Sequence, residues 1–450
     1  MFKKVNNIHF VGIGGSGMSG IAEVLINLGH KVSGSDLKRS ETTDYLKDIG
    51  AKIFIGHRES NAKNAQVLVT STAVGKDNPE VLFALKNKIP IIRRIEMLAE
   101  LARMKYCITI AGTHGKTTTT SMTALVLAQG GLDPTIVVGG RLKNLNTSAR
   151  LGRGQYLVAE ADESDGSFLS LSPAVTVVTN IDNDHLDYYH TMENLKEAFI
   201  KHINSIPFYG AAIICTDDKI AASIVNKIKR KYISYGFNKN ADLRAEDIKV
   251  KNLTTTFNVL YNGKKIGKIA LKIPGLHNVL NSLASIGVGL WLGIPFNLIA
   301  KGLLSFDGVK RRLELKGSVN DITIIDDYGH HPTEVKASIE AIKHFFKNKK
   351  LIVLFQPHRF TRTQNLFKEF GKSFDMADKV FVMDIYPAGE APIKNVNSDL
   401  ILNELKKNNV CAQKYSDASA LKKELSAGDI VLTLGAGDVF KQGEKLLTLL

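Results

Sequence analysis

Hydrophobic positions in this chain gather in short apolar runs that alternate with longer segments of mixed polarity. Such runs occupy residues 8–11, 107–111, 156–159 and 175–179, and each is followed directly by glycine, asparagine or glutamate. Short runs bounded by residues of this kind are typical of buried strands, and the segments between them have the length of helices. This repeated alternation predicts an α/β fold with mostly parallel sheets.

The chain has 450 residues, enough for about three domains at the usual size of roughly 150 residues each. A new strand begins near Cys107, and another strand–helix series begins after the segment 308–313. We therefore predict domains at 1–106, 107–312 and 313–450.

The longest apolar stretch, 283–300, is interrupted by Gly293-Ile294-Pro295. Because glycine and proline break such a run, the stretch predicts a buried core helix and no membrane span. The first residues enter an apolar strand at once, without the pattern of a cleaved leader.

The formal net charge is +15, but the lysines are scattered along the chain and form no recognisable nucleic-acid module. The three cysteines lie far apart in no metal or redox spacing, which suits a reducing compartment. We expect a cytoplasmic protein that acts on small molecules, with no nucleic-acid partner and no membrane insertion.

The most specific signal lies where the run 107–111 enters a glycine loop that is followed by four threonines. The N–H groups of such a loop and the dipole of the next helix form a phosphate site. Lys116 can reach terminal phosphates, and the Thr117 hydroxyl can bind Mg²⁺. The loop is shorter than the usual one, since Ile110 stands where a first glycine is expected. We predict that a nucleoside triphosphate is bound by Gly112, Thr113, His114, Gly115, Lys116, Thr117 and Thr118.

A second glycine loop, Gly12-x-Gly-Gly-x-Gly17, follows the first strand, and the next strand, 31–35, ends on Asp36. This arrangement also marks dinucleotide-binding domains. Alone it is weak evidence for NAD, because any nucleotide diphosphate satisfies a pyrophosphate site at a helix start. The two loops together predict two phosphorylated ligands, with a diphosphate at Gly12, Gly14, Gly15, Ser16 and Gly17.

Acidic residues follow two further strands. Glu160-Ala-Asp-Glu-Ser-Asp165 follows the run 156–159, and Asn180-Ile-Asp-Asn-Asp-His185 follows the run 175–179. Open α/β sheets bind ligands at the C-terminal ends of their strands. Carboxylates with one imidazole suit Mg²⁺ held jointly with phosphates. Some of these side chains are expected to cap helices, but four acidic residues in six are too many for caps alone.

Together these motifs resemble the Mur ligases of peptidoglycan synthesis, and most of all the member that attaches L-alanine to UDP-N-acetylmuramate. The resemblance runs from residue 8 to residue 438. It also rests on Gly275-Leu-His-Asn278 with Asn281, Gly308-Val-Lys-Arg-Arg312, Asp326-Asp-Tyr-Gly-His-His-Pro332, Phe355-Gln-Pro-His-Arg-Phe-Thr-Arg362, Asp384-Ile-Tyr-Pro-Ala-Gly-Glu390 and Leu434-Gly-Ala-Gly-Asp438. It implies a Rossmann-like N-terminal domain for the UDP group, a central P-loop ATPase-type domain and a Rossmann-like C-terminal domain.

The resemblance further implies that ATP phosphorylates the muramate carboxylate and that the amine of L-alanine attacks the acyl phosphate. Catalysis then consists mainly of positioning and of neutralising negative charge. Two Mg²⁺ ions are implied, one held by Thr117 and Glu160 and the other by Glu160 and His185.

The remaining implied roles fall into three groups. Asp36 forms hydrogen bonds near the UDP-sugar loop. Contacts to ATP are implied for Asn278, Asn281, Arg311 or Arg312, and Asp327. L-Alanine binding and stabilisation of the intermediate are implied for Tyr328, His330, His358, Arg359 and Arg362; the catalytic set is Lys116, His185, His330, Arg359 and Arg362.

Some assignments stay open. Glu163 is an alternative to Glu160 as metal ligand, because only three positions separate them. One of His330 and His331 is expected to serve the reaction and the other the fold, because neighbours on a loop point in different directions.

Other functions compete with ligation. A nicotinamide-dependent oxidoreductase uses only the first glycine loop and leaves the triphosphate loop and the acidic segments without a role. A non-enzymatic nucleotide-binding protein leaves the histidine and arginine candidates unexplained. Within the ligases, the rival is the recycling enzyme that attaches an intact peptide to the same nucleotide sugar, which needs a larger acceptor pocket.

Two positions depart from family patterns. Phe199 stands where ligases that add later amino acids generally carry a carbamylated lysine. We therefore expect a core side chain there and a reaction that does not depend on bicarbonate, since Lys196 and Lys201 point elsewhere on the helix. Ser148 stands where many relatives have asparagine or histidine, which affects one sugar contact.

Overall fold

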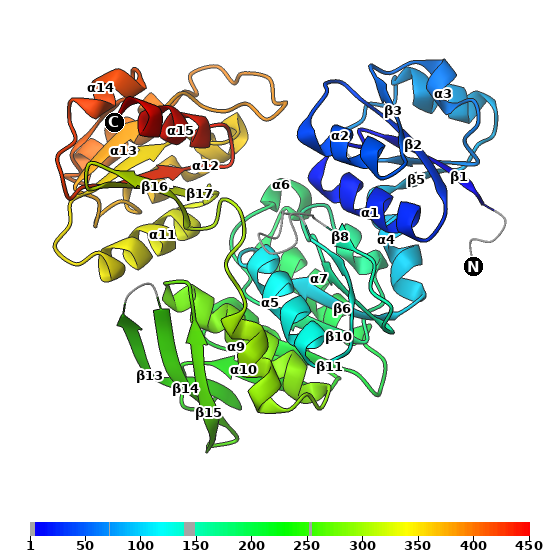
Figure 1. Ribbon diagram of the computed structural model, residues 1–450, viewed down its shortest axis with the longest axis horizontal. Coiled ribbons are helices and arrows are strands. Elements are labelled where there is room, and N and C mark those ends of the chain that lie inside the picture. Colours follow the sequence, from blue (N-terminus) through cyan, green and yellow to red (C-terminus); the bar gives the residue numbers. More distant parts are fainter. Residues whose placement is uncertain (1–4, 72, 139–148, 252–253) are drawn as a thin grey trace. The chain divides into compact units, whose positions relative to one another are not determined.

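The computed structural model describes residues 5–71, 73–138, 149–251 and 254–450 (Figure 1). Strands and helices alternate through the described chain, as the sequence predicts. They build three sheets in two compact units. The first unit comprises 1–248, 256–271 and 278–307; the second comprises 249–255, 272–277 and 308–450.

The N-terminal sheet of the first unit has five parallel strands in the order β3-β2-β1-β4-β5. The order changes direction between β1 and β4, and ligands of open α/β sheets bind at such a point. The strands are β1 (Asn7–Val11), β2 (Lys31–Asp36), β3 (Lys52–Ile55), β4 (Val67–Thr70) and β5 (Ile91–Arg93). The helices are α1 (Ser16–Asn27), α2 (Glu41–Asp48), α3 (Pro79–Lys86) and α4 (Arg94–Arg103), with the 3₁₀ turn η1 (Glu59–Ala62).

The central sheet has ten strands in the order β15-β14-β13-β12-β11-β10-β6-β9-β7-β8, and it belongs to the first unit except for the adjoining ends of β13 and β14 within 249–255. Strand β6 lies between β10 and β9 and is parallel to both, so all three C-terminal ends meet at one edge. The strands are β6 (Tyr106–Ala111), β7 (Thr135–Val137), β8 (Ala149–Arg150), β9 (Tyr156–Glu160), β10 (Val175–Val178), β11 (Ala211–Cys215), β12 (Tyr232–Gly236), β13 (Leu243–Lys251), β14 (Thr254–Tyr261) and β15 (Lys264–Leu271). The helices are α5 (Lys116–Gln129), α6 (Leu186–Tyr189), α7 (Met192–Asn204), α8 (Lys219–Ile224), α9 (Leu276–Trp291) and α10 (Phe296–Leu304), with η2 (Ser167–Ser170) and η3 (Val225–Lys227).

One continuous hydrophobic core joins these two sheets. It includes Ile21 of α1, Leu98 of α4, Leu157 of β9 and Phe168 of η2, all buried. The N-terminal glycine loop and the ends of the central strands therefore belong to one packed body.

The second unit contains a six-stranded sheet in the order β16-β17-β21-β18-β19-β20, in which only the β16–β17 pair is antiparallel. Separate cores cover its two faces, one with Val335 and Phe370 and the other with Leu421 and Leu446, so the sheet is doubly wound. The strands are β16 (Glu314–Val319), β17 (Ile322–Asp327), β18 (Leu351–Phe355), β19 (Lys379–Val382), β20 (Ala412–Lys414) and β21 (Ile430–Leu434). The helices are α11 (Pro332–Phe345), α12 (Phe360–Gly371), α13 (Asp399–Lys407), α14 (Ala418–Lys422) and α15 (Phe440–Leu449).

Two predictions concern packing, and the one for Phe199 is confirmed. The sequence predicts one core helix over 283–300, but this stretch forms parts of two helices, α9 and α10, because the chain turns at Gly293, whose φ is +73°. Phe199 is fully buried on α7, with its ring 5.3 Å from that of Phe168. Within the described ranges, no helix combines the length and the apolar character that crossing a bilayer requires. The domain boundaries after residues 106 and 312 stay predictions.

Candidate active site

The predicted triphosphate loop joins the C-terminal end of β6 to the start of α5. Gly112 and Gly115 have φ values of +127° and +81°, in the left-handed region that favours glycine. A Cβ at Gly112 would lie 2.2 Å from Thr179 Oγ1, and a Cβ at Gly115 would lie 2.6 Å from Asn281 Oδ1. Gly115 precedes α5 without any side-chain cap. The first N–H groups of a helix have no partner within the helix, so this start suits an anion.

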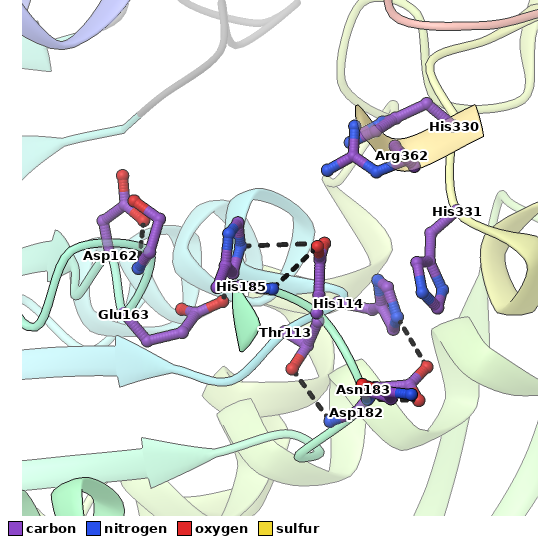
Figure 2. Close-up of polar contacts among 12 residues, drawn as sticks. Thr113, His114, Asp162, Glu163, Asp182, Asn183, His185, His330, His331 and Arg362 are labelled. Carbon is purple, nitrogen blue, oxygen red and sulfur yellow. Dashed lines mark hydrogen bonds and ion pairs between the residues drawn. The ribbon is translucent and has the colours of Figure 1, made fainter. Parts of the chain in front are cut away.

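The segment after β10 holds the loop in shape. Asn180 accepts a hydrogen bond from His114 N at 2.8 Å and donates one to His114 O at 3.0 Å. Asp182 N donates to Thr113 Oγ1 at 2.9 Å, and the Asp182 carboxylate lies 3.0 Å from His114 Nε2 (Figure 2). The segment that follows β10 thus fixes Thr113 and His114, two of the residues predicted to bind ATP.

Lys116 is anchored inside this loop. Its Nζ donates to Glu163 at 2.9 and 2.8 Å, to Gly112 O at 2.6 Å and to Thr113 O at 3.2 Å. Burial acts to lower the pKa of Lys116, but the nearby carboxylates, Glu163 first, outweigh burial and raise this pKa above its usual value.

His185 lies beside Glu163, with 3.8 Å between Nε2 and Oε1 (Figure 2). Its backbone φ is +61°, and its N–H donates to Asp184 Oδ1 at 2.9 Å. The backbone of Glu163 is also fixed, because the Tyr189 hydroxyl donates to the Glu163 carbonyl oxygen at 2.6 Å. Glu163 therefore stays a full alternative to Glu160 as the metal ligand that accompanies His185.

Asn278 and Asn281 lie beside the triphosphate loop on α9. Both are buried, and Asn281 Nδ2 donates to Asn278 Oδ1 at 3.3 Å. Asn281 Oδ1 accepts from Thr119 Oγ1 of α5 at 3.1 Å. The structure thus brings these two predicted ATP contacts to the loop they are expected to serve.

The N-terminal glycine loop is held by the end of β2. Ser35 O accepts from Gly12 N at 2.8 Å and from Ile13 N at 3.0 Å, and Asp36 Oδ2 accepts from Gly14 N at 2.8 Å. Helix α1 begins at Ser16, and its N-cap Gly15 provides no side-chain cap. Asp36 thus contacts the loop itself, while the helix start is left open to a phosphate group.

A cavity of about 300 Å³ lies between this loop and the end of β9. Its lining includes Gly12, Gly15, Gly17, Met18, Ser71, Ala73, Arg94, Leu98, Val137, Val138, Glu160 and Asp162. A Cβ at Gly17 would lie 2.6 Å from Arg94 Nη1, and Arg94 Nη2 lies 3.5 Å from Asp162 Oδ2. Sequence reasoning missed Arg94; its signal is a cation directly after a strand, at the edge where such sheets bind ligands. Ser148, the position of the altered sugar contact, lies outside the described residues.

In the second unit, Arg311 and Asp327 are largely committed to the fold. Arg311 donates to Asp326 at 3.1 Å, to Gly435 O at 2.6 Å and to Gly437 O at 3.0 Å. The Asp327 carboxylate accepts from Leu313 N, Gly329 N and Ser338 Oγ.

Arg312 and the two neighbouring histidines share Glu334. The Glu334 carboxylate lies 3.6 Å from Arg312 Nη1 and 3.3 Å from His330 Nδ1. His331 Nδ1 accepts from Thr333 N at 3.4 Å and thereby caps α11. Of the two histidines, His331 thus has a role in the fold as the N-cap of α11, and the His330 ring lies 5.4 Å from that of Tyr328 and 5.6 Å from that of His358.

His358 and Arg362 lie together, and Arg359 points to a different partner. Arg362 Nη1 donates to His358 Nδ1 at 3.4 Å, and the His358 ring stacks on Tyr386 at 5.7 Å and 8°. Arg359 has a φ of +71°, and its Nε lies 4.0 Å from Glu390 Oε1. Tyr386 was not among the predicted residues, although it lies in the Asp384–Glu390 motif.

The chain has three α/β sheets and two glycine loops, each of which precedes a helix start without a side-chain cap. A partly buried lysine and an acidic sheet edge adjoin one of these loops, and together these features define a nucleotide-using enzyme. The chain belongs to the Mur ligase family. Three family models match it in order: the Mur ligase family, catalytic domain, at 7–106; the Mur ligase middle domain at 110–289; and the Mur ligase, glutamate ligase domain, at 311–437.

Individual relatives cover the whole chain. The UDP-N-acetylmuramate–L-alanine ligase of Endomicrobium trichonymphae is 65% identical over 450 residues, covering 100% of both chains. The ligase of the same name from Geobacter sp. (strain M21) is 53% identical and covers 99% of this chain and 98% of its own. The crystal structure of UDP-N-acetylmuramate-alanine ligase from Thermotoga maritima matches with a TM-score of 0.84 at 30% identity, covering 98% of each chain.

Proposed function

We propose that this chain joins L-alanine to the carboxylate of UDP-N-acetylmuramate, with hydrolysis of ATP to ADP and phosphate, in the synthesis of peptidoglycan precursors. The observation that carries the proposal is the 65% identity, over the full length of both chains, with a ligase named for this reaction. The anchored Lys116 in a glycine loop supplies the phosphate site that the reaction needs.

The chemistry has two steps. An oxygen of the muramate carboxylate attacks the γ-phosphorus of ATP, and ADP leaves, so the carboxylate becomes an acyl phosphate. The amine nitrogen of L-alanine then attacks the carbonyl carbon, loses a proton, and phosphate departs as the amide forms. Both steps concentrate negative charge, which Lys116 and the N–H groups at the start of α5 stabilise.

The acidic edge fits Mg²⁺. Three carboxylates, Glu160, Asp162 and Glu163, lie near enough to Lys116 to raise its pKa, and burial raises the pKa of Glu163 itself. Carboxylate oxygens are the ligands that Mg²⁺ prefers. Glu160 or Glu163, with Thr117 and His185, would hold two ions, and these would neutralise charge on the phosphates.

L-Alanine is assigned to the second unit. Burial lowers the pKa of His358 to about 4, with Arg362 and Arg359 adding to the effect, so this imidazole is neutral at pH 7. A neutral ring leaves Arg362 as the cation that binds the alanine carboxylate, for which the guanidinium fork is well shaped. Tyr328 and His330 are further candidates to contact L-alanine, because the His330 ring lies 5.4 Å from that of Tyr328 and 5.6 Å from that of His358. Arg359 and Tyr386 are neighbours of His358 and are candidates for the same role. Arg311 is engaged by backbone carbonyls and Arg312 lies 3.6 Å from Glu334, so both stay candidates to contact ATP.

Phosphate release with ATP and UDP-N-acetylmuramate, scanned over free amino acids and the recycled tripeptide, tests the proposal. Release that requires both the nucleotide sugar and L-alanine is the expected result. Release with the tripeptide and none with L-alanine would assign the chain to the recycling ligases. Binding of NADH, seen as a fluorescence change, would instead support the oxidoreductase alternative.

A further inference from the structure

A buried carboxylate adjoins the glycine loop of the N-terminal sheet and has no part in the chemistry above. Glu80 is the second residue of α3, and its side chain is fully buried. Burying a carboxylate is costly, and a well-packed apolar side chain is often at least as stabilising. This charge therefore calls for an explanation other than the stability of the fold.

Four donors converge on the Glu80 carboxylate. Oε2 accepts from Ser35 Oγ at 2.6 Å and from His9 Nε2 at 3.3 Å. Oε1 accepts from Asn61 Nδ2 at 2.6 Å and from Arg58 N at 3.2 Å. Burial acts to raise the pKa of Glu80, but the hydrogen bonds from His9, Ser35 and Asn61 outweigh burial and hold this pKa below its usual value. The group is an ionised carboxylate that fixes one end of β2.

The same end of β2 contacts the glycine loop, which follows β1. Ser35 binds Glu80 through its hydroxyl and binds the N–H groups of Gly12 and Ile13 through its carbonyl oxygen. The Ser35 hydroxyl also lies 2.9 Å from His57 Nδ1, so it is held on two sides. The conformation of the glycine loop thus depends on the position of Ser35. The direction of the uncapped start of α1 depends on it as well.

We propose that Glu80 is a positioning residue, which acts through Ser35 to hold the glycine loop in the conformation that binds the diphosphate of UDP-N-acetylmuramate. The inference rests on the proposed function of the chain. Glu80 touches no substrate in this scheme, so its loss should weaken binding of the nucleotide sugar and leave the chemical step intact.

The test compares Glu80→Ala, Glu80→Gln and Ser35→Ala in the full-length chain. For Glu80→Ala we expect the KM for UDP-N-acetylmuramate to rise by about 10-fold, with kcat and the KM for ATP within about two-fold of wild type. Glu80→Gln should restore much of this loss. The amide oxygen can serve Asn61 and Arg58, and its NH₂ group can donate to the Ser35 hydroxyl. Ser35→Ala should raise the same KM, and it provides the test if Glu80→Ala fails to fold.

Two matched variants control for general damage. Val81→Ala truncates the next residue of α3, which belongs to a separate small core, and lowers stability without touching Ser35. Asn87→Ala removes the C-cap side chain of α3, whose Nδ2 donates to Phe83 O at 2.8 Å, at the opposite end of that helix from Glu80. Both should keep the wild-type KM.

Three results would overturn the proposal: an unchanged KM in folded Glu80→Ala and Ser35→Ala, an equal rise of KM in the controls, or a fall in kcat alone. Failure of the proposed function itself would look different, because the wild-type chain would then release no phosphate from ATP in the presence of UDP-N-acetylmuramate and L-alanine.

Discussion

The ammonium group of Lys116 binds the Glu163 carboxylate at 2.8 Å and, on its other side, the carbonyl oxygen of Gly112 at 2.6 Å. The lysine is therefore positioned within the loop by the protein itself. Because its charge is fixed before nucleotide arrives, little reorganisation is needed when phosphate charge develops, which is the condition for effective electrostatic catalysis.

Lys116→Met should lower the rate of phosphate release by roughly 10³-fold, because one cation at the transferred phosphoryl group is lost. Binding of UDP-N-acetylmuramate, measured by titration calorimetry, should persist. Lys105→Met is the matched control, since Lys105 donates to Gly152 O and Gly154 O, at 2.9 and 2.6 Å, at the other end of β6. A Lys116→Met enzyme within about ten-fold of wild type would remove this lysine from the catalytic set.

Glu160→Ala and His185→Ala should each abolish ligation and leave the circular dichroism spectrum unchanged, because each removes a ligand near the γ-phosphate. Phosphate release should be titrated with Mg²⁺, with Asp165→Ala as control; Asp165 accepts from Ser167 N at 3.0 Å in a local turn. Glu163→Ala removes the partner of Lys116 as well as a possible metal ligand, so the decisive variant is Glu160→Ala. An active Glu160→Ala beside an inactive Glu163→Ala would transfer the metal role to Glu163.

The stability of the central domain should fall with acid because of His202. This histidine is fully buried between Thr109 and Thr176, each 3.1 Å from its Nε2, and burial lowers its pKa to about 4. The unfolded chain has a histidine pKa of about 6.5, so below that pH it binds a proton that the folded chain does not. The stabilising contribution is complete above about pH 6.5 and is lost as the pH falls toward 4, a total of about 3 kcal/mol.

Urea unfolding followed by the fluorescence of Trp291 measures this effect, because Trp291 is the single tryptophan of the chain. Between pH 7 and pH 4.5, wild type should lose more stability than His202→Gln. His344→Gln, on an exposed position of α11, should follow wild type. Parallel pH curves for wild type and His202→Gln would refute the assignment.

Ligation should not depend on bicarbonate, because Phe199 fills the position of the modified lysine and packs against Phe168. Lys196→Ala and Lys201→Ala should keep activity close to wild type in buffer freed of carbon dioxide. A loss of about 100-fold in either variant, about 2.7 kcal/mol of transition-state stabilisation, would point to a carbamylated lysine if short carboxylates also restored activity.

The local sequence was sufficient to predict the strand, the glycine loop and the helix start that form the predicted phosphate site. The glycines at 112 and 115, the strand before them and the helix after them are neighbours in the chain, and their backbone requirements are visible residue by residue. The strand–helix alternation likewise predicted an α/β fold with mostly parallel sheets, because strands buried on both faces are continuous apolar runs.

The sequence did not predict which side chains from distant segments contact one another. The sequence left Glu160 and Glu163 equivalent, yet only folding places Glu163 against Lys116, 47 positions earlier. It offered Arg311 and Arg312 as equals, but β21 adjoins β17 and brings the carbonyls of Gly435 and Gly437 to Arg311. Arg94 and Glu80 belong to none of the sequence motifs. Their neighbours come from other strands, because the order of the N-terminal sheet brings the ends of β1, β2 and β5 together. Periodicity and spacing encode backbone conformation and burial, whereas the partners of a charged side chain depend on which strands become neighbours.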